Sequence, residues 1–491
     1  MPISRRRIVL AASATVLSSM PTLTRSQEAE NTYDLIVIGG GVAGLSALVL
    51  ALERGLSRVL LLESEPMVGG TSIISGGLWA VSGTQLQAQN HIVDTDEAFT
   101  QDIFAVGQHK NRPDVVAAFI QHNRPQYEWV INNLGVRPYA ITKGAGLPRA
   151  HAFRMHELIG ALLQKAQKLG GEIRVATKAE RLLFDQKQNR VIGCLASRAG
   201  GAVEFRSRLG VILATGGFGR NPELLSKFAP RMKYVTSIAA QGARGDGLLM
   251  ALELGAGLRD MAYLEGSYAF IKEPSTIEDM SLLPYYGAVV VNQQAKRFVD
   301  ESLPYKQVAR VVLEQPGGKS YVVFDERIRR LALEQTLDHH LWASIDHGIV
   351  PDYVFAGNSL AQAAQAAGLD PVELQRTIRA YNASLTGEHL PRGPLSVNNG
   401  ALLAISEAPF YVMPASVCML GTYCGLSVDA HTRVQRTDDT AINGLFAIGE
   451  VIGGFHGASF IMGTALAKAQ ALARACILYL TAQRASDEKI S

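Results

Sequence analysis

Several features that would assign a function at once are scarce in this sequence. Cysteine occurs at 4 of 491 positions, namely Cys194, Cys418, Cys424 and Cys476. They are too few and too scattered for a disulfide framework, so most are expected to be buried free thiols; a Cys418–Cys424 pair is the alternative. No Cys-x-x-Cys-His motif is present, which excludes a c-type haem attached to this chain.

An excess of charge of one sign is also lacking. Lys and Arg together number 47 against 44 Asp and Glu, and no basic run stands out, which excludes a nucleic-acid-binding protein. No spacing typical of a metal site is present, and His339-His340 are interpreted as part of a solvated face. With 47% apolar residues, the chain is long enough for two or three domains with full cores.

No apolar run is long enough to span a membrane, which needs about 20 residues. The mildly apolar stretch Ile8–Met20 follows Ser4-Arg5-Arg6-Arg7 and precedes Pro21, which predicts a signal peptide over residues 1–28. The arginine pair resembles a twin-arginine signal, and that resemblance implies export of a folded, cofactor-loaded protein to the periplasm. A general secretory signal and a start-site artefact are the alternatives.

The strongest motif lies between Tyr33 and Glu65. An apolar run, Leu35 to Ile38, ends in Gly39-Gly40-Gly41, a helical run follows to Glu53, and a second apolar run covers Val59 to Leu62. Strand, glycine turn, helix and strand in this order predict one βαβ unit that binds a dinucleotide. The alternative is a glycine turn in an ordinary α/β protein.

The residues of this unit have separate expected roles. Gly39 allows the tight turn, Gly41 lets the backbone approach a pyrophosphate, and Gly44 lets the helix pack closely on the strand. The N–H groups at the helix start would face the phosphates. Glu63 is placed to accept the ribose hydroxyls and to repel a 2′-phosphate, so FAD or NAD is expected rather than NADP.

Further glycine-rich stretches follow. Val68–Trp79 contains Gly69-Gly70-Thr71-Ser72 and Ser75-Gly76-Gly77, which suit a ligand wrap better than a core element. A second glycine turn ends the run Val211–Gly219, and Gly245-Asp246-Gly247 opens a helix. With these motifs, the sequence from residue 32 onward resembles the FAD-dependent family of fumarate reductase flavoproteins, urocanate reductases, L-aspartate oxidases and 3-ketosteroid dehydrogenases.

The resemblance implies an α/β fold with two parts. Residues 31–260 and 423–485 would form a Rossmann-like FAD-binding domain of GR2 type. Residues 261–422, where the cofactor motifs lapse, would form an inserted α+β capping domain that carries part of the substrate site.

The resemblance also implies the contacts to FAD. The residues expected to bind the cofactor are Gly39, Gly41, Gly44, Glu63, Gly70, Thr71, Ser72, Gly76, Gly77, Ala179, Asp246, Glu450, Ala465 and Leu466. The helix that opens at Gly463 would direct the positive end of its dipole at the flavin, which favours hydride acceptance. No His lies between Gly69 and Gly77, where covalently flavinylated relatives carry one, so noncovalent binding is expected.

Fumarate reductases of this family grip a dicarboxylate with two His and an Arg, and use a second Arg as the proton donor. The corresponding positions here hold Ser267, Tyr305, Gly421 or Tyr423, and Phe460. Aromatic rings in place of guanidinium groups would leave the carboxylates without bidentate partners, at a cost of several kcal/mol. Fumarate is therefore not the expected substrate.

The segment Ser302-Leu303-Pro304-Tyr305 resembles the ketosteroid dehydrogenases, whose Tyr abstracts a proton. Tyr305 is therefore expected to be catalytic, with its pKa of about 10 lowered by Lys306 or Arg310. Ser267, Tyr423, His456 and Phe460 are expected to bind the substrate. Simple packing of Tyr305, and a structural role for His456, are the alternatives.

These observations predict an exported FAD oxidoreductase that acts on a carbon–carbon bond next to the carbonyl of a neutral or weakly polar small molecule, in either direction. One alternative is a reductase of an unsaturated acid, fed by a separate cytochrome or a quinone pool. Another is a flavin-bearing electron-transfer subunit without its own substrate. An NAD-dependent enzyme is disfavoured, because it would not need the second glycine turn, Asp246 and Glu450.

Overall fold

The structure is a computed structural model that describes residues 31–142, 148–233, 235–271, 274, 276–335, 338–385 and 403–490, with side chains described up to residue 485. The predicted signal peptide over residues 1–28 lies outside the described residues. The sequence also predicts a loop at residues 384–400, and most of this segment lies outside the described residues.

A mixed eight-stranded sheet forms the centre of the larger domain. Its strands are β1 (Thr32–Ile38), β2 (Val59–Leu62), β6 (Glu172–Arg174), β7 (Lys178–Asp185), β8 (Arg190–Arg198), β9 (Gly201–Leu213), β18 (Arg433–Gln435) and β19 (Ala441–Ala447). The main order is β18-β19-β9-β1-β2-β6, and β7 and β8 extend from β9 as an antiparallel pair. The neighbours of β1 and β2 run parallel to them, as the predicted βαβ unit requires.

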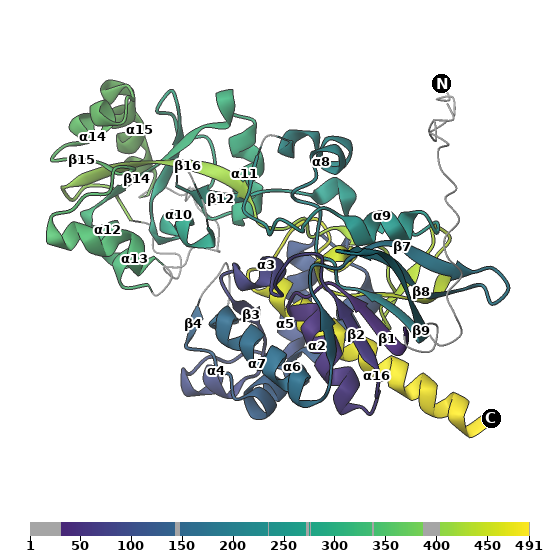
Figure 1. Cartoon of the computed structure of the whole chain (residues 1–491). Helices are drawn as coiled ribbons and strands as arrows, with labels where there is room; N and C mark the ends of the chain where they lie inside the picture. The colour runs from purple at the N-terminus through teal and green to yellow at the C-terminus, as the bar shows by residue number, and fades with distance from the viewer. Residues whose placement is uncertain are drawn as a thin grey trace.

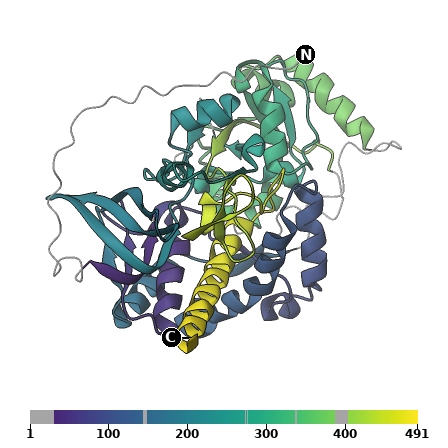
Figure 2. The same cartoon turned by 90° about the vertical axis from the view of Figure 1, so that its right-hand side faces the viewer.

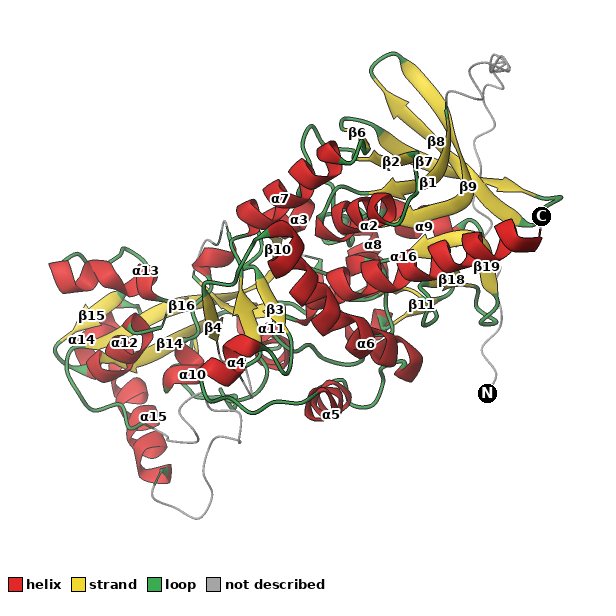
Figure 3. Cartoon of the chain, turned by 90° about the horizontal axis from the view of Figure 1, so that it is seen from below, coloured by secondary structure: helices red, strands yellow, loops and turns green. Residues whose placement is uncertain are grey.

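Helices cover this sheet and bury its central strands. Strand β1 has no exposed residue, because α2 (Val42–Glu53) packs on it and the parallel strands on both sides complete its hydrogen bonds. The long helix α16 (Thr464–Ile490) packs against α2 and α6 (Pro113–Trp129). Figure 2 shows α16 in yellow running across the larger domain towards the C-terminus, and Figure 3 shows it beside the sheet.

A second sheet forms the smaller lobe, which we call the capping domain (residues 267–419); one of its strands, β10, comes from the preceding part of the chain. Its strands are β10 (Thr236–Ser237), β12 (Ser267–Phe270), β13 (Val289–Asn292), β14 (Ser320–Asp325), β15 (Phe355–Gly357) and β16 (Phe410–Met419). Its helices are α10 (Leu283–Tyr286), α11 (Tyr305–Leu313), α12 (Glu326–Leu333), α13 (His339–Trp342), α14 (Leu360–Ala366) and α15 (Pro371–Ser384). The lobe stands to one side of the larger domain and has its own apolar core (Figure 1).

Shorter elements complete the larger domain. They are α3 (Gly70–Ile73), α4 (Gln85–Gln89), α5 (Asp96–Val106), α7 (Met155–Lys168), α8 (Pro222–Phe228), α9 (Asp246–Leu252), the sheet of β3 (Leu78–Ala80), β4 (Ala140–Thr142) and β5 (Ala150–Ala152), and the pair β11 (Leu258–Arg259) and β17 (Gly425–Leu426).

The predicted α/β class is confirmed, with one difference in detail. Strand β10 precedes residue 260, yet it pairs with β16 in the second sheet. Cys418 and Cys424 are buried free thiols, as are the other two cysteines. Among the described helices, none combines the length and the apolar character that crossing a bilayer requires.

Candidate active site

The turn after β1 requires glycine at two positions and leaves space at a third. Gly39 has φ +112°, and a Cβ there would lie 2.3 Å from the Ala214 carbonyl oxygen. A Cβ at Gly44 would lie 1.9 Å from the Gly39 oxygen, so only glycine lets α2 approach β1. At Gly41 the nearest atom to a Cβ would be Ser72 Oγ at 3.5 Å. The predicted turn at Gly39 and close packing at Gly44 are confirmed, and open space remains in front of Gly41.

Glu63, directly after β2, is fixed as a hydrogen-bond acceptor. Its Oε2 accepts a hydrogen bond from the Gly40 N–H at 2.7 Å, and its Oε1 accepts from the Glu65 N–H at 2.9 Å and from Ser64 Oγ at 3.1 Å. The residue is 8% exposed. A carboxylate held in this way beside the turn suits ribose hydroxyls and repels a phosphate.

The glycine-rich wrap lies against the start of α2. Thr71 Oγ1 accepts a hydrogen bond from the Ala240 N–H, and Ser72 Oγ accepts one from the Val42 N–H, each at 3.2 Å. Val42 is the first residue of α2, so its hydrogen bond to Ser72 joins the wrap to the N-terminus of this helix. The backbone N–H groups of the first turn of α2 lie beside the wrap.

A cavity of about 780 Å³ runs from this surface to the capping domain. The predicted residues that border it are Gly39, Gly41, Glu63, Gly70, Thr71, Ser72, Gly76, Gly77, Ala179, Asp246, Ser267, Tyr305, Tyr423, Glu450, Phe460, Ala465 and Leu466. Gly44 lies beneath α2, and His456 does not border the cavity. Residues from five separate parts of the chain are thus brought together at one site.

Other residues predicted to contact FAD also border the cavity. Asp246, the first residue of α9, is 3.1 Å from Lys178 Nζ. Glu450 Oε1 accepts a hydrogen bond from the Thr422 N–H at 2.7 Å, and burial raises the pKa of Glu450. Ala465 and Leu466 lie in the first turn of α16, whose N-terminus therefore opens on the cavity.

The residues present fit FAD. The nucleotide end has open space at Gly41 and an acceptor at Glu63, and the far end has the start of α16 beside Glu450. The volume lies in the range typical of sites for cofactor-sized ligands. No His lies in the wrap between Gly69 and Gly77 to form a covalent link.

Three aromatic residues, which we call the aromatic wall, close the far end of the cavity: Tyr305, Tyr423 and Phe460. Phe460 is central, with its ring centroid 4.5 Å from that of Tyr423 and 6.2 Å from that of Tyr305. Tyr305 begins α11 of the capping domain, whereas the other two belong to the returning larger domain. Ser267, at the start of β12, also borders this end.

The expected lowering of the Tyr305 pKa by Lys306 or Arg310 is wrong. Burial raises the pKa of Tyr305, and it also raises the pKa of Tyr423. Lys306 Nζ lies over the Tyr423 ring, and Arg310 binds the Glu265 carboxylate, so neither cation lowers the Tyr305 pKa. Both phenols are therefore neutral hydrogen-bond donors at neutral pH.

His456 lies behind the aromatic wall. Its ring packs edge-on against Tyr423 with centroids 5.4 Å apart, and its Nε2 is buried without a hydrogen-bond partner. Burial, with Lys468 and Lys306 nearby, holds the His456 pKa well below its ordinary value. A neutral imidazole in this place supports the wall rather than contacting a ligand in the cavity.

Sequence reasoning did not identify Lys468 or Arg154 near the site, and it expected Lys306 only as a cation that lowers the Tyr305 pKa. Lys306 and Lys468 are 4% and 1% exposed, and Lys468 and Arg154 border the cavity. Lys306 and Lys468 both lie on the buried, apolar face of a helix. A lysine at a position where the helical period predicts an apolar residue is the signal that could have revealed them. Arg154 follows a short strand and has no such signal.

Comparisons with known proteins agree on one family. Residues 34–466 match the family described as FAD binding domain. The chain is 28% identical to the fumarate reductase (cytochrome) of Shewanella frigidimarina over 447 residues, covering 89% of this chain and 75% of that protein. It is 30% identical to the urocanate reductase of Eggerthella lenta over 451 residues, covering 86% and 70%. The fold is similar to that of 3-ketosteroid-delta4-(5alpha)-dehydrogenase from Rhodococcus jostii RHA1, with a TM-score of 0.75, 23% identity and coverage of 92% and 97%.

Proposed function

Because the chain belongs to the FAD binding domain family and is an FAD-dependent oxidoreductase acting on carbon–carbon bonds, we propose that it reduces the double bond of a neutral α,β-unsaturated carbonyl compound. The aromatic wall carries this proposal. Where dicarboxylate reductases would need guanidinium groups, Tyr305 and Phe460 face the cavity, and Tyr423 borders it beside them. An uncharged reactant fits such a wall without leaving buried charges unpaired.

Side chains of the protein supply the proton and bind the carbonyl oxygen. When bound, FAD supplies hydride chemistry at the carbon–carbon bond. A neutral phenol is a proton donor, so Tyr305 is suited to protonate the carbon next to the carbonyl, and Tyr423 to donate a hydrogen bond to the carbonyl oxygen. Leu282, Leu420 and Met462 border the same region and exclude water from it.

An anaerobic experiment tests the substrate class. The flavin of the holoenzyme is photoreduced and mixed with cyclohex-2-enone, and return of the oxidised flavin spectrum is followed. We expect the enone to restore the spectrum and Tyr305→Phe to slow this step by about 100-fold or more. Tyr321→Phe, on β14 away from the cavity, is the matched control. Restoration by fumarate or urocanate, with no response to the enone, would contradict the proposal.

Reduction of an unsaturated acid is the second candidate, and Arg154 is the observation that favours it. Arg154 borders the cavity, with its guanidinium 4.8 Å from the Tyr139 ring centroid and 3.9 Å from Glu157 Oε1, and its side chain is 54% exposed. If the substrate is an acid bound by this group, Arg154→Gln abolishes its turnover, whereas the exposed Arg137→Gln does not. Under the enone proposal, both variants keep their activity.

We also propose that the protein is exported to the periplasm and receives electrons from a separate cytochrome or quinone. Ser4-Arg5-Arg6-Arg7 before Ile8–Met20 supports the first proposal, and the absence of a c-type haem motif in this chain supports the second. Fractionation of cells that express a C-terminally tagged chain tests export. The double change Arg5→Lys and Arg6→Lys should leave the tagged protein in the cytoplasm.

A further inference from the structure

Lys306, the second residue of α11, is buried, and no described residue forms an ion pair with it. Its side chain lies on the packed face of the helix with Val308, Ala309 and Val312. Nζ donates a hydrogen bond to the backbone oxygen of Glu265 at 3.4 Å, and among the described residues no carboxylate lies within ion-pair distance of it. An uncompensated buried ammonium is unfavourable, so its retention calls for a role that uses the charge.

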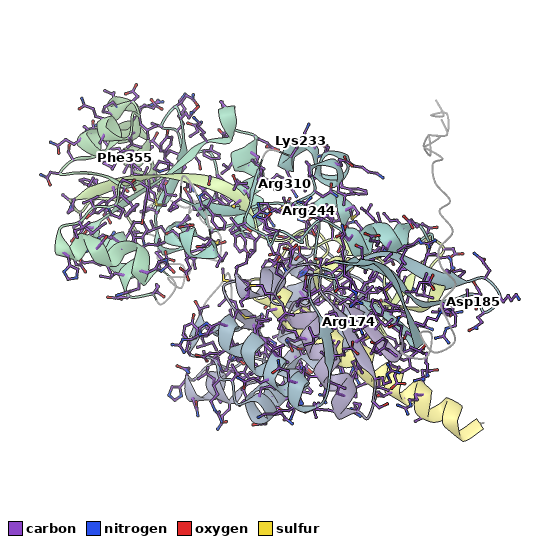
Figure 4. All side chains as sticks on the ribbon, viewed as in Figure 1. Arg174, Asp185, Lys233, Arg244, Arg310 and Phe355 are labelled. Atoms are coloured by element: carbon purple, nitrogen blue, oxygen red, sulfur yellow. The ribbon has the colours of Figure 1, made fainter. Side chains whose placement is uncertain are left out.

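The Glu265 carboxylate, which favours the charged form of Lys306, forms its ion pair with Arg310 instead. Glu265 Oε1 accepts hydrogen bonds from Nε and Nη2 of Arg310, which is 46% exposed. Figure 4 shows Arg310 where the capping domain meets the larger domain. Because Arg310 holds the ion pair with Glu265, Lys306 interacts with this carboxylate only at longer range.

The ammonium of Lys306 forms cation–π contacts with two rings of the aromatic wall. Lys306 Nζ lies 3.6 Å from the centroid of the Tyr423 ring and 5.2 Å from that of Phe460. A cation over the face of a phenol attracts its π electrons and makes its hydroxyl a stronger hydrogen-bond donor. Among the described residues, no cation is recorded over the ring of Tyr305. The two phenols of the wall are thus distinguished by this contact.

The backbone of Tyr423 supports a constrained role. Its φ is +52°, a region that residues other than glycine seldom adopt and that the surrounding structure must enforce. This conformation presents the side chain to the cavity with Lys306 on one ring face and Phe460 close by.

We propose that Lys306 is a positioning residue that acts through Tyr423: its ammonium holds the phenol ring in place and strengthens its hydrogen bond to a carbonyl oxygen in the cavity. The carbonyl as ligand rests on the proposed function. The pairing of Lys306 with Tyr423 rests on geometry alone.

The charge that this role needs depends on pH. Burial lowers the pKa of Lys306 to about 7, while Glu265, Cys424 and Glu450 favour its charged form. The titratable and charged groups around it are Glu265, Arg310, Tyr423, Cys424, Glu450, His456 and Lys468. The effect on Tyr423 should therefore fade as the pH rises through about 7.

A double-mutant cycle on the holoenzyme, with cyclohex-2-enone as the probe, tests the role in the reaction. Lys306→Met removes the charge and keeps the apolar stem, and we expect it to lower kcat by about tenfold. Tyr423→Phe should lower kcat at least as much, and the double variant should be no slower than Tyr423→Phe. Lys306→Arg should restore most of the loss. Lys227→Met, an exposed lysine with its Nζ 5.1 Å from the Phe228 ring centroid, is the matched control.

A second measurement needs no substrate. Tyr423 is replaced by 3-fluorotyrosine, and its ¹⁹F resonance is followed from pH 5 to 9. We expect a shift with a midpoint near the Lys306 pKa of about 7, and its loss in Lys306→Met. Additive kinetic losses in the cycle, or a resonance that ignores pH over this range, would overturn the proposal. If the enone is not turned over but the resonance titrates as expected, only the proposed function fails.

Discussion

At the scale of single residues, Asp338 makes stability depend on pH. It directly precedes α13 and is 0% exposed, and its Oδ2 accepts hydrogen bonds from the Leu282 N–H at 2.9 Å and from Ser281 Oγ at 3.0 Å. Burial outweighs these donors and raises the Asp338 pKa to about 7. The folded protein therefore keeps a proton there that the unfolded chain has lost.

The sign of the effect follows from proton binding. The unfolded carboxyl titrates near pH 4, so the contribution is fully present below that pH and is lost as the pH rises to about 7. We expect urea unfolding to show a fall of about 2 to 4 kcal/mol in the stability of the wild-type protein over this range. Asp338→Asn should lose this slope, whereas Asp352→Asn, an exposed control in the same domain, should keep it. An unchanged slope in Asp338→Asn would contradict the assignment.

At the scale of residues, the sequence predicts a residue's role correctly where that role depends on residues close to it in the chain. Gly39 and Gly44 belong to one continuous motif, and their geometry was predictable. Tyr305 and Lys306 are adjacent, yet successive helical residues differ in direction by about 100°. Lys306 therefore lies over Tyr423 instead of activating Tyr305, and only the tertiary structure reveals this.

At the scale of elements, the βαβ unit depends on the contact between α2 and the turn after β1. A Cβ at Gly44 would lie 1.9 Å from the Gly39 backbone oxygen, which cannot move without disturbing the turn. We expect Gly44→Ala to displace α2, to lower stability by about 1 to 3 kcal/mol and to weaken FAD binding by at least about tenfold. Thermal unfolding and fluorescence titration of the apoprotein with FAD measure both effects.

Gly160 provides the matched control. It lies within α7, and a Cβ there would meet no atom within 4 Å. Gly160→Ala should therefore stabilise the protein by about 0.5 to 1 kcal/mol and leave FAD binding unchanged. If Gly44→Ala binds FAD as tightly as Gly160→Ala does, close helix packing is not what forms the site.

The elements that sequence predicted best are those with a clear period. The strands and helix of the βαβ unit were found close to their observed bounds, because apolar spacing defines them locally. Asp370-Pro371 likewise has the residue types that begin a helix and predicts one to Tyr381, and α15 covers Pro371–Ser384. Strand β10 has two residues and no period. Its place beside β16 depends on residues about 180 positions away, which no local pattern encodes.

At the scale of the whole molecule, the cavity exists because two cores meet. One apolar core spans the larger domain and a separate one lies within the capping domain. The lapse of cofactor motifs after residue 260 predicted an inserted segment. It could not predict that the ring centroids of Tyr305, in that segment, and Phe460, in the larger domain, would lie 6.2 Å apart. That distance depends on how the two domains pack.

Separate cores predict how the protein unfolds. We expect calorimetry of the apoprotein to show two transitions, one for each domain. Most residues at the predicted FAD site belong to the larger domain, and a ligand at about 1,000 times its Kd adds about 4 kcal/mol to the domain that binds it. Excess FAD should therefore raise the larger-domain transition by several degrees and the capping-domain transition by less. AMP, which can occupy only the nucleotide end beside Glu63, should move the same transition by a smaller amount. A single transition that FAD raises as a whole would contradict this prediction, because it would mean that the interface joins the two domains into one cooperative unit.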